Sequence, residues 1–445
     1  MSYVPAAPPI HQGPPSFPWG TAAALGILTA VLYGLLPALA PAELAGPSDI
    51  LLLGVVLGVV VGTAVRFDWR IAPLLAAVGA VTVGCRFLLV GDDPRAVVPI
   101  AVVIGLDLWA MTYLVQRTEA RALQRPRDVV ALMVIACGVA VIAGLMAASV
   151  LELSGTAEDD FWHMARSWTV DDVFGLVCIA PAFMTISRPR TWPLSLAGEY
   201  VVACLFSAAV TYAIFRVVTP GEQGLFGWPY LVILGPLWIA VRLGVHAVAP
   251  VIAVMAWALA VSTVDGRGPF SAASASAMDQ LLAVELFAIV IAGTVLLLGV
   301  LRDDRLRSLE RERESSRLLR EIVDGTNALV FAKSYQGEDA LNGKYVLVNN
   351  AFENALGRSA SELLGKSDQE MFEPGVSHAF RDNDLRVMES GTGFTVQEHD
   401  VTPSGALRHY NSSKFPLLDA SGQTWGVGGV AIDSTDLVHA REREA

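Results

Sequence analysis

Four charged residues lie within long apolar runs and are the first candidates for chemistry. These residues are Asp107, Asp172, Arg242 and Glu285. A charged side chain inside a membrane-spanning segment is expensive and is functional by default, although buried ion pairs also occur there. Two interpretations therefore stay open. One is a polar cavity between helices that binds a small ligand, and the other is a set of structural ion pairs, such as Arg242 with an acid.

Three further candidates lie near the ends of apolar runs. Trp168 and Asp171 begin an apolar helix together with Asp172. An acid in a first helical turn stabilises the helix dipole, and a tryptophan anchors a helix at the membrane interface. These residues therefore form either a cap with an anchor or part of a ligand site. Arg267 lies in the loop GRGPF, on the side where the positive-inside rule disfavours arginine, which makes it a candidate contact for an anion.

The elements that position these residues are indicated by composition. The 445 residues are 53% hydrophobic and only 17% charged, against about 25% charged in soluble domains. Residues 1–301 contain 14 arginines, no lysine and 19 acids, whereas residues 302–445 contain 17 basic residues and 24 acids. Neither part is basic enough for a nucleic-acid binder. The first lysine is Lys333, so a retinal Schiff base within the membrane is excluded.

Apolar runs predict a polytopic α-helical membrane bundle with eight to ten spanning helices, since about 20 apolar residues cross a bilayer. Ten candidate spans follow a disordered segment, 1–18: 19–40, 49–67, 71–90, 96–115, 128–151, 170–187, 196–218, 228–245, 247–264 and 278–301. With the N-terminus in the cytoplasm, nine loop arginines lie inside and four outside, as the positive-inside rule requires. We therefore expect a multi-pass protein of the bacterial inner membrane, in contact with the lipid bilayer, with both termini cytoplasmic.

After Leu301 the composition changes to that of a soluble protein. Residues 302–321 form a charged helix in which a heptad pattern predicts a weak parallel coiled coil, and hence a homodimer. A single solvated helix is the alternative. Residues 322–436 predict a cytoplasmic α/β domain, with two strands, small helices and three further strands. Residues 437–445 begin another charged helix, expected to lead to an output.

Several segments resemble known families. VNNAFENALGRSASELLGKS and KFPLLDASGQTWGVGGVAID resemble a PAS domain. That resemblance implies that Asp433 and Thr435 join the last strand to the output helix and relay the signal. SWTVDDVFGLVCIAPAF, AVRLGVHAVAP and GRGPF resemble the membrane-associated sensor (MASE) domain of type one, which implies a sensor domain over residues 19–301.

The resemblance implies a sensory signal-transduction protein that relays a signal through PAS to an output. In such proteins the output is a histidine kinase, a diguanylate cyclase or a phosphatase. The sequence contains no GGDEF, HExxH or Walker motif, so we expect the output to lie outside this chain. We predict no catalytic residue and no metal ligand. The identity of a cofactor, of a small ligand and of a membrane partner protein stays open. The alternatives are a transporter or channel with a regulatory PAS domain, and an enzyme whose catalytic domain this sequence does not include.

Overall fold

The computed structural model divides into two compact units, Met1–Ser308 and Leu309–Ala445, and each is described by itself. The expected disorder of residues 1–18 lies outside the described residues. The residues described are 19–35, 47–67, 69–90, 93–118, 122–157, 159–185, 193–217, 228–271, 276–336, 341–401 and 407–444.

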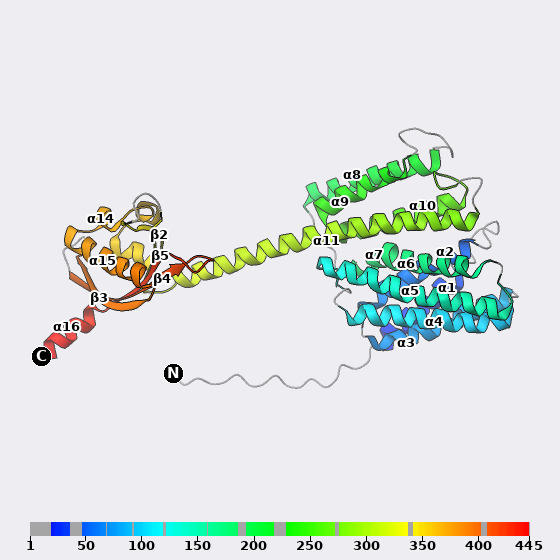
Figure 1. The fold of residues 1–445 in the computed structure, drawn as a ribbon, viewed down its shortest axis with the longest axis horizontal. Coiled ribbons are helices and arrows are strands. Elements are labelled where there is room, and N and C mark those ends of the chain that lie inside the picture. The colour runs from blue at the N-terminus through cyan, green and yellow to red at the C-terminus, as the bar shows by residue number, and fades with distance from the viewer. Residues whose placement is uncertain are drawn as a thin grey trace. The chain divides into compact units, whose positions relative to one another are not determined.

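The first unit is a bundle of apolar helices (Figure 1). In chain order these are α1 (Trp19–Leu35), α2 (Pro47–Ala64), η3 (Trp69–Ile71), α3 (Ala72–Val90), α4 (Pro94–Arg117), α5 (Pro126–Ser154), α6 (Phe161–Phe174), η5 (Gly175–Ile179), α7 (Ala180–Thr185), α8 (Leu194–Tyr212), η6 (Ala213–Val217), η8 (Pro229–Ile233), α9 (Leu234–Leu243), α10 (Val245–Val264) and α11 (Ala277–Asp324).

Seven of the described helical segments are long and apolar enough to cross a membrane, and three shorter apolar helices accompany them. The shorter ones are Ala23–Leu32, Leu53–Ala64 and Pro229–Leu243. Each of the ten predicted spans has a counterpart among these segments. The expected multi-pass membrane bundle is therefore confirmed, and we call this part of the chain the membrane unit.

The sixth segment differs from its predicted bounds. It begins at Phe161 rather than at residue 170, because Asp160 caps the helix by accepting a hydrogen bond from the Trp162 backbone N–H at 3.1 Å. It then passes from α6 through one π-helical turn, η5, into α7. Turns of this kind insert an extra residue into a helix and are frequent at functional sites.

The packing of α4 illustrates how the bundle meets the bilayer. Ile100, Ile104 and Leu108 are buried in the core, whereas Val98 and Leu106 are exposed. This helical periodicity gives α4 one face toward the other helices and one apolar face toward lipid. An exposed apolar face is the expected outer surface of a membrane protein, since the bilayer solvates it.

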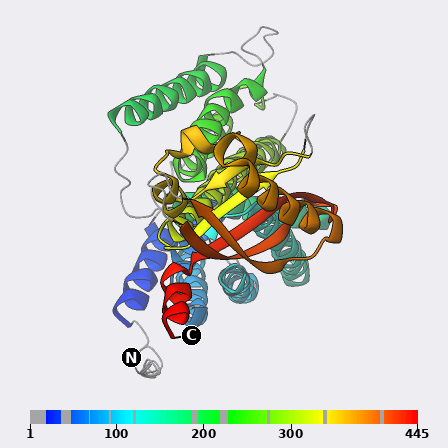
Figure 2. The same cartoon turned by 90° about the vertical axis from the view of Figure 1, so that its left-hand side faces the viewer.

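The second unit contains the end of α11, a sheet and small helices (Figure 2). Its five strands pair antiparallel in the order β2-β1-β5-β4-β3. The strands are β1 (Leu329–Ser334), β2 (Lys344–Val348), β3 (Phe394–Val401), β4 (Leu407–Leu418) and β5 (Thr424–Asp433). The helices after α11 are α12 (Asn350–Leu356), α13 (Ala360–Leu363), α14 (Asp368–Met371), α15 (Pro374–Ser390) and α16 (Thr435–Glu444). The predicted α/β domain with two strands, helices and three strands is confirmed.

Candidate functional site

Four acidic side chains from three helices meet inside the membrane unit. Asp107 lies on α4, Asp171 and Asp172 on α6, and Glu285 on α11. All four are buried, with at most 6% of each residue exposed. Asp171 and Asp172 each interact electrostatically with Asp107. Glu285 interacts electrostatically with Asp171 and with Asp172. We call these four residues the acid cluster.

Close packing of α2 against α6 and η5 helps to form the acid cluster. Gly54, Gly58 and Gly62 lie one turn apart along α2, and small residues at this spacing let two helices approach closely. A methyl group at Gly54 would collide with Asp171, and one at Gly175 would collide with the Gly54 backbone. The approach brings the Gly54 N–H to 2.8 Å from Asp171 Oδ2, to which it donates a hydrogen bond.

The acid cluster has few hydrogen-bond donors. One oxygen of each carboxyl group, namely Asp107 Oδ1, Asp171 Oδ1, Asp172 Oδ2 and Glu285 Oε1, is buried without a hydrogen-bond partner among the described residues. The side chain of Trp168, which is half-buried, donates to Asp172. Sequence analysis placed Trp168, Asp171 and Asp172 together, and the structure brings Asp107 and Glu285 to them.

The two predicted arginines lie outside the acid cluster. The side chain of Arg242 on α9 is 59% exposed and forms two hydrogen bonds with Glu199 on α8, of 2.8 and 3.0 Å. The structural ion pair considered for Arg242 is therefore present, but with Glu199. Arg267 is exposed in the loop after α10. The positive charges of both arginines are thus separate from the four buried acids.

The helix α11 is also held at the end where it leaves the membrane unit. Asp303 Oδ2 accepts a hydrogen bond from the Val245 N–H at 3.1 Å, at the sharp turn where Gly244 has a φ of 87°. Arg302 donates to the Arg242 carbonyl at 2.7 Å and pairs with Asp303 at 2.8 Å. The helix that carries Glu285 is therefore fastened to the α9–α10 turn, and we call this set of contacts the exit latch.

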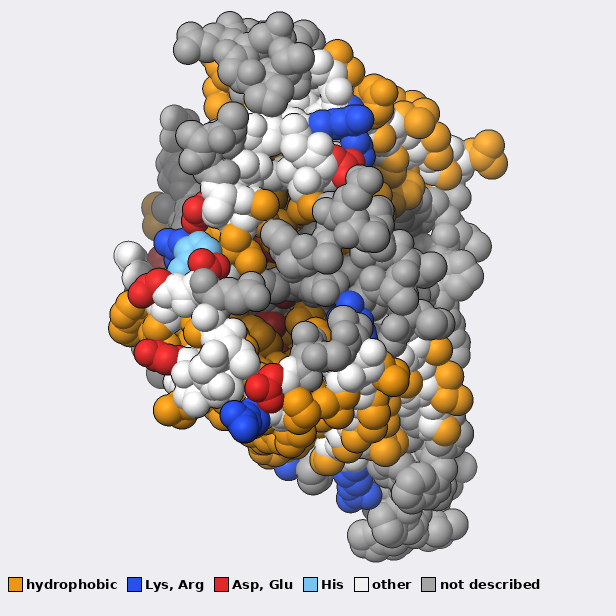
Figure 3. Space-filling view, turned by 90° about the vertical axis from the view of Figure 1, so that its right-hand side faces the viewer, with side chains coloured by type: hydrophobic (Ala, Val, Ile, Leu, Met, Phe, Trp, Pro, Cys, Tyr) orange, Lys and Arg blue, Asp and Glu red, His pale blue; other side chains and the backbone are white. Residues whose placement is uncertain are grey.

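The start of α11 carries a second set of charges. Asp279 lies 3.2 Å from His163 and 3.3 Å from Arg166, both on α6. His163 also lies 3.4 Å from Asp159. Figure 3 shows this end of the membrane unit, where acidic side chains gather around a hollow in the surface. Charged groups at this mouth therefore connect the same two helices that supply three residues of the acid cluster.

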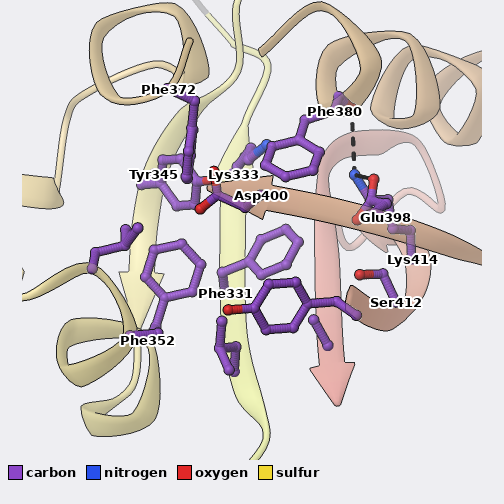
Figure 4. Close-up of a pocket in the computed structure, with 15 residues that line it drawn as sticks. Phe331, Lys333, Tyr345, Phe352, Phe372, Phe380, Glu398, Asp400, Ser412 and Lys414 are labelled. Atoms are coloured by element: carbon purple, nitrogen blue, oxygen red, sulfur yellow. Dashed lines mark hydrogen bonds and ion pairs between the residues drawn. The ribbon is translucent and has the colours of Figure 1, made fainter. Parts of the chain in front are cut away.

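A different arrangement of charges borders the cleft of the second unit, where Figure 4 labels Lys333, Lys414 and Glu398. Asp384 on α15 accepts from Lys333 on β1 at 2.7 Å and from Lys414 on β4 at 2.8 Å. Lys333 also lies 2.5 Å from Asp368, and Lys414 lies 2.8 Å from Glu398. All five side chains are buried. We call them the ion-pair network.

Opposite charges in the ion-pair network stabilise the ionised forms of Asp384 and Lys333. Burial raises the pKa of Asp384, but Lys333 and Lys414 lower it more, so that it lies below its ordinary value. Burial lowers the pKa of Lys333, but Asp384 and Asp368 raise it above its ordinary value. Burial and these carboxylates raise the pKa of Tyr345, whose hydroxyl donates to Asp368 at 2.8 Å. The charged forms of Asp384 and Lys333 are therefore both favoured, and the two side chains are hydrogen-bonded to each other.

The ion-pair network leaves little space in the cleft. The cavity has a volume of about 40 Å³ and is lined by Phe331, Tyr345, Phe380, Ser412 and residues of the network. Ligand pockets commonly measure about 300–1,000 Å³, whereas a buried water needs only about 10–15 Å³. The cleft in this conformation therefore fits a few water molecules.

Two junctions connect the second unit to helices at its ends. The Asn349 side chain, which is fully buried, donates to the carbonyls of Val323 and Ala328 at 2.9 Å each. It thereby joins the end of α11 to β1. At the other end, Asp433 Oδ1 accepts from the Thr435 N–H at 2.9 Å, and Thr435 Oγ1 accepts from the His409 N–H at 3.0 Å. These contacts tie β5 and β4 to α16.

The candidates predicted from the sequence did not include Gly54, the residues of the exit latch, Asn349 or the ion-pair network. A signal existed for Gly54, because glycines recur every four residues along α2. A signal also existed for Lys333, which shares a strand face with Phe331 and therefore points inward. Nothing in the sequence paired Lys333 or Lys414 with Asp384, since the partners come from separate elements.

Comparison with known proteins agrees with this architecture. The MASE1 family model matches residues 24–306, and a model described as a PAS fold matches residues 340–439. The methanogenesis regulatory histidine kinase FilI of Methanothrix harundinacea is 32% identical over 126 residues, which are 28% of this chain and 13% of that protein. A diguanylate cyclase of Vibrio cholerae is 28% identical over 124 residues, which are 27% of this chain and 37% of that protein.

This chain thus spans well under half the length of these two curated relatives. Among solved structures, a PAS domain from Colwellia psychrerythraea is 17% identical, with a TM-score of 0.24, over 27% of this chain and 97% of that chain. The MASE1 match covers more than half of the chain. The chain therefore belongs to the MASE1 family and combines a membrane sensor domain of that family with a PAS domain.

Proposed function

We propose that the acid cluster is the sensing site of this protein and that α11 relays its state through the PAS domain to an output. The observation that carries this proposal is the continuity of α11. Its 48 residues include Glu285 of the acid cluster, and Arg302 and Asp303 of the exit latch. Asn349 joins the end of the same helix to the PAS sheet. A change at Glu285 therefore acts on the helix that enters the PAS domain.

The relay requires a helical joint with two arrangements that the sensing site stabilises unequally. Glu285 and Asp303 are separated by about 27 Å at a rise of about 1.5 Å per residue. Movement of α11 at the acid cluster would strain or release the contacts of Arg302 and Asp303 with the α9–α10 turn. The exit latch is thus suited to hold one of the two positions of α11.

The output class is proposed from the relatives, which are a histidine kinase and a diguanylate cyclase. We propose that α16 leads to a histidine kinase, a diguanylate cyclase or a phosphatase, with Asp433 and Thr435 holding the start of that helix. We further propose a homodimer in the bacterial inner membrane, with both termini cytoplasmic. Leu319 is 62% exposed on the charged part of α11, and it lies in the predicted heptad seam that a second copy would cover.

Hydrogen exchange with mass spectrometry on the purified full chain tests the relay. The Glu285→Gln variant removes one carboxyl group from the acid cluster. We expect at least a several-fold change in exchange over the charged part of α11 and over β1, which Asn349 joins to it. The matched control is Glu310→Gln, an exposed acid on the same helix, which is expected to change neither region. A response of Glu285→Gln confined to the membrane unit would contradict the relay.

A transporter or channel with a regulatory PAS domain is the second candidate, because buried acids also mark ion pathways through membranes. Ion-coupled uptake into liposomes that contain the full chain would favour it. Uptake that is abolished by Asp107→Asn, with no change of α11 in the exchange experiment, would replace the sensor proposal.

A further inference from the structure

We infer that the ligand of the acid cluster is the proton: its carboxyl groups share protons, and loss of these protons drives Glu285 away from α6. This inference rests on the proposed function, because it names what the sensing site binds. It is carried by the four buried oxygens without partners, by the charges that surround them and by the lack, among the described residues, of a group of side chains arranged to hold a metal ion.

The first step is the balance of donors and acceptors. The four carboxyl groups have eight oxygens, and an ionised carboxylate only accepts hydrogen bonds. The donors found among the described residues are the Gly54 N–H and the Trp168 side chain. Two ionised carboxylates cannot bond to each other, whereas a protonated carboxyl group donates to a neighbouring carboxylate. Added protons therefore supply the donors that the oxygens without partners lack.

The second step is the balance of charge. Residues 1–332 contain no lysine. Two arginines near the ends of α11 pair with acids outside the cluster. Arg242 pairs with Glu199, and Arg166 pairs with Asp279. Within the described residues, the charged neighbours recorded for the cluster are its own acids. Four buried like charges without a counter-charge are strongly unfavourable, and protonation removes them.

The arrangement of the acids in the cluster favours a proton over a metal ion as the ligand. No group of three or more His, Cys, Asp or Glu side chains in the described part of the chain is arranged to hold a metal ion. Hard cations such as Ca²⁺ need about six to eight oxygens that converge on one point. A proton needs only two oxygens, one on each side. The cluster therefore suits protons better than a hard cation.

Titratable groups on η5 and α6 surround Glu285. Cys178 on η5 lies beside Glu285, and Asp171 and Asp172 face it from α6. At the mouth, His163 of α6 contacts Asp279 of α11. His163 lies about 12 Å along α6 from Asp171, so it is not part of the acid cluster.

Infrared spectroscopy of the full chain in detergent tests the inference, with protons as the only ligand varied. Protonated carboxyl groups absorb in a carbonyl band that carboxylates lack. We expect this band in the unmodified protein above about pH 5, where exposed carboxyl groups are ionised, and its progressive loss as the pH is raised further. The double variant Asp172→Asn/Glu285→Gln should lose about half of the band, and Asp107→Asn about a quarter, since the four groups share the signal.

The matched control is Glu199→Gln, which changes an acid of the membrane unit that already has an arginine partner. It should keep the full band. A band that is absent at every pH, or that is equally strong in the double variant, would overturn the inference. Asp107→Asn supplies an independent reading if the double variant fails to fold.

The exchange experiment then separates this inference from the proposed function. If α11 responds to Glu285→Gln while the carbonyl band is absent, the relay stands and the ligand is another cation. If the band is present and titrates while α11 responds neither to pH nor to Glu285→Gln, the cluster binds protons but is not the sensing site. If both respond, and the pH response of α11 disappears in the double variant, both proposals hold.

Discussion

The acid cluster and the ion-pair network are both buried groups of charged side chains, but only the network contains its own counter-charges. In the PAS domain, Asp384 lies between Lys333 and Lys414, and each lysine contacts a second carboxylate. In the membrane unit, four acids face one another without a described cation. Buried charges that compensate each other make a rigid part of the structure, whereas uncompensated charges respond to whatever neutralises them. Burial alone therefore does not distinguish a structural cluster of charges from a sensing one.

The largest effect should follow from breaking the compensated network. Asp384→Asn leaves Lys333 and Lys414 buried without the carboxylate between them, and removing one partner of a buried ion pair costs about 3–5 kcal/mol. We expect the free energy of unfolding of residues 309–445 to fall by this amount, measured by urea denaturation with Trp425 fluorescence. The fragment must first show the same hydrogen-exchange pattern as the full chain.

The matched control for that prediction is Glu321→Gln. Glu321 pairs with Arg317 on the exposed part of α11, and exposed ion pairs contribute only about 0–1 kcal/mol. If Asp384→Asn were no more destabilising than Glu321→Gln, the network would not be a structural element, and the contrast with the acid cluster would disappear.

The free energy of unfolding of the same fragment should also depend on pH, with a smaller loss at low pH and another at high pH. The pKa of Asp384 is lowered from its ordinary value of about 3.9. Its contribution to the free energy of unfolding is therefore complete above about pH 3.9 and is lost as the pH falls through the lowered pKa of the folded state. The pKa of Lys333 is raised above its ordinary value of about 10.4. Its contribution to the free energy of unfolding is therefore complete below about pH 10.4 and is lost as the pH rises through the raised pKa of the folded state.

We therefore expect the contribution of these two groups to be constant between about pH 4 and about pH 10. Circular dichroism during urea unfolding at several pH values measures it. A loss of stability centred near neutral pH that is absent in the Asp384→Asn variant would show that the network titrates in the same range as the acid cluster is expected to.

The smallest effect should have the opposite sign. Asp107→Asn removes one uncompensated charge from the acid cluster, so we expect the Tm of the full chain at high pH to rise by roughly 1–2 °C, which corresponds to about 1 kcal/mol in a unit of this size. The gain should shrink at low pH, where the cluster of the unmodified protein is already neutral. Thermal unfolding of the detergent-purified chain at two pH values measures this shift.

Glu199→Gln is the control for this variant, because it breaks the exposed pair with Arg242 and should leave Tm unchanged or slightly lower. A fall in Tm for Asp107→Asn at high pH would mean that the acid cluster has a counter-charge after all. In that case the two clusters would belong to one structural class.

Much of the architecture could be predicted from the sequence, because hydrophobic periodicity is a local property of the chain. The ten apolar segments, the change of composition after Leu301 and the five strands each depend on neighbouring residues alone. The C-terminal end of α15 at Gly391, whose φ is 62°, is also a local feature, because glycine adopts this left-handed conformation readily. The start of the sixth segment was missed because the cap at Asp160 extends a helix whose first turns are polar.

What the sequence could not decide is which charged residues meet. Asp107, Asp172 and Glu285 were predicted as candidates one by one, yet their association depends on how α4, α6 and α11 pack and rotate about their axes. The same packing separates Arg242 from them and gives it to Glu199. In the PAS domain, the pairing of Lys333 with Asp384 depends on where α15 lies across the sheet. The sequence by itself thus determined the elements and the side chains that are expensive to bury, and only the tertiary structure decided which of them are compensated, because compensation requires contact between elements distant in the chain.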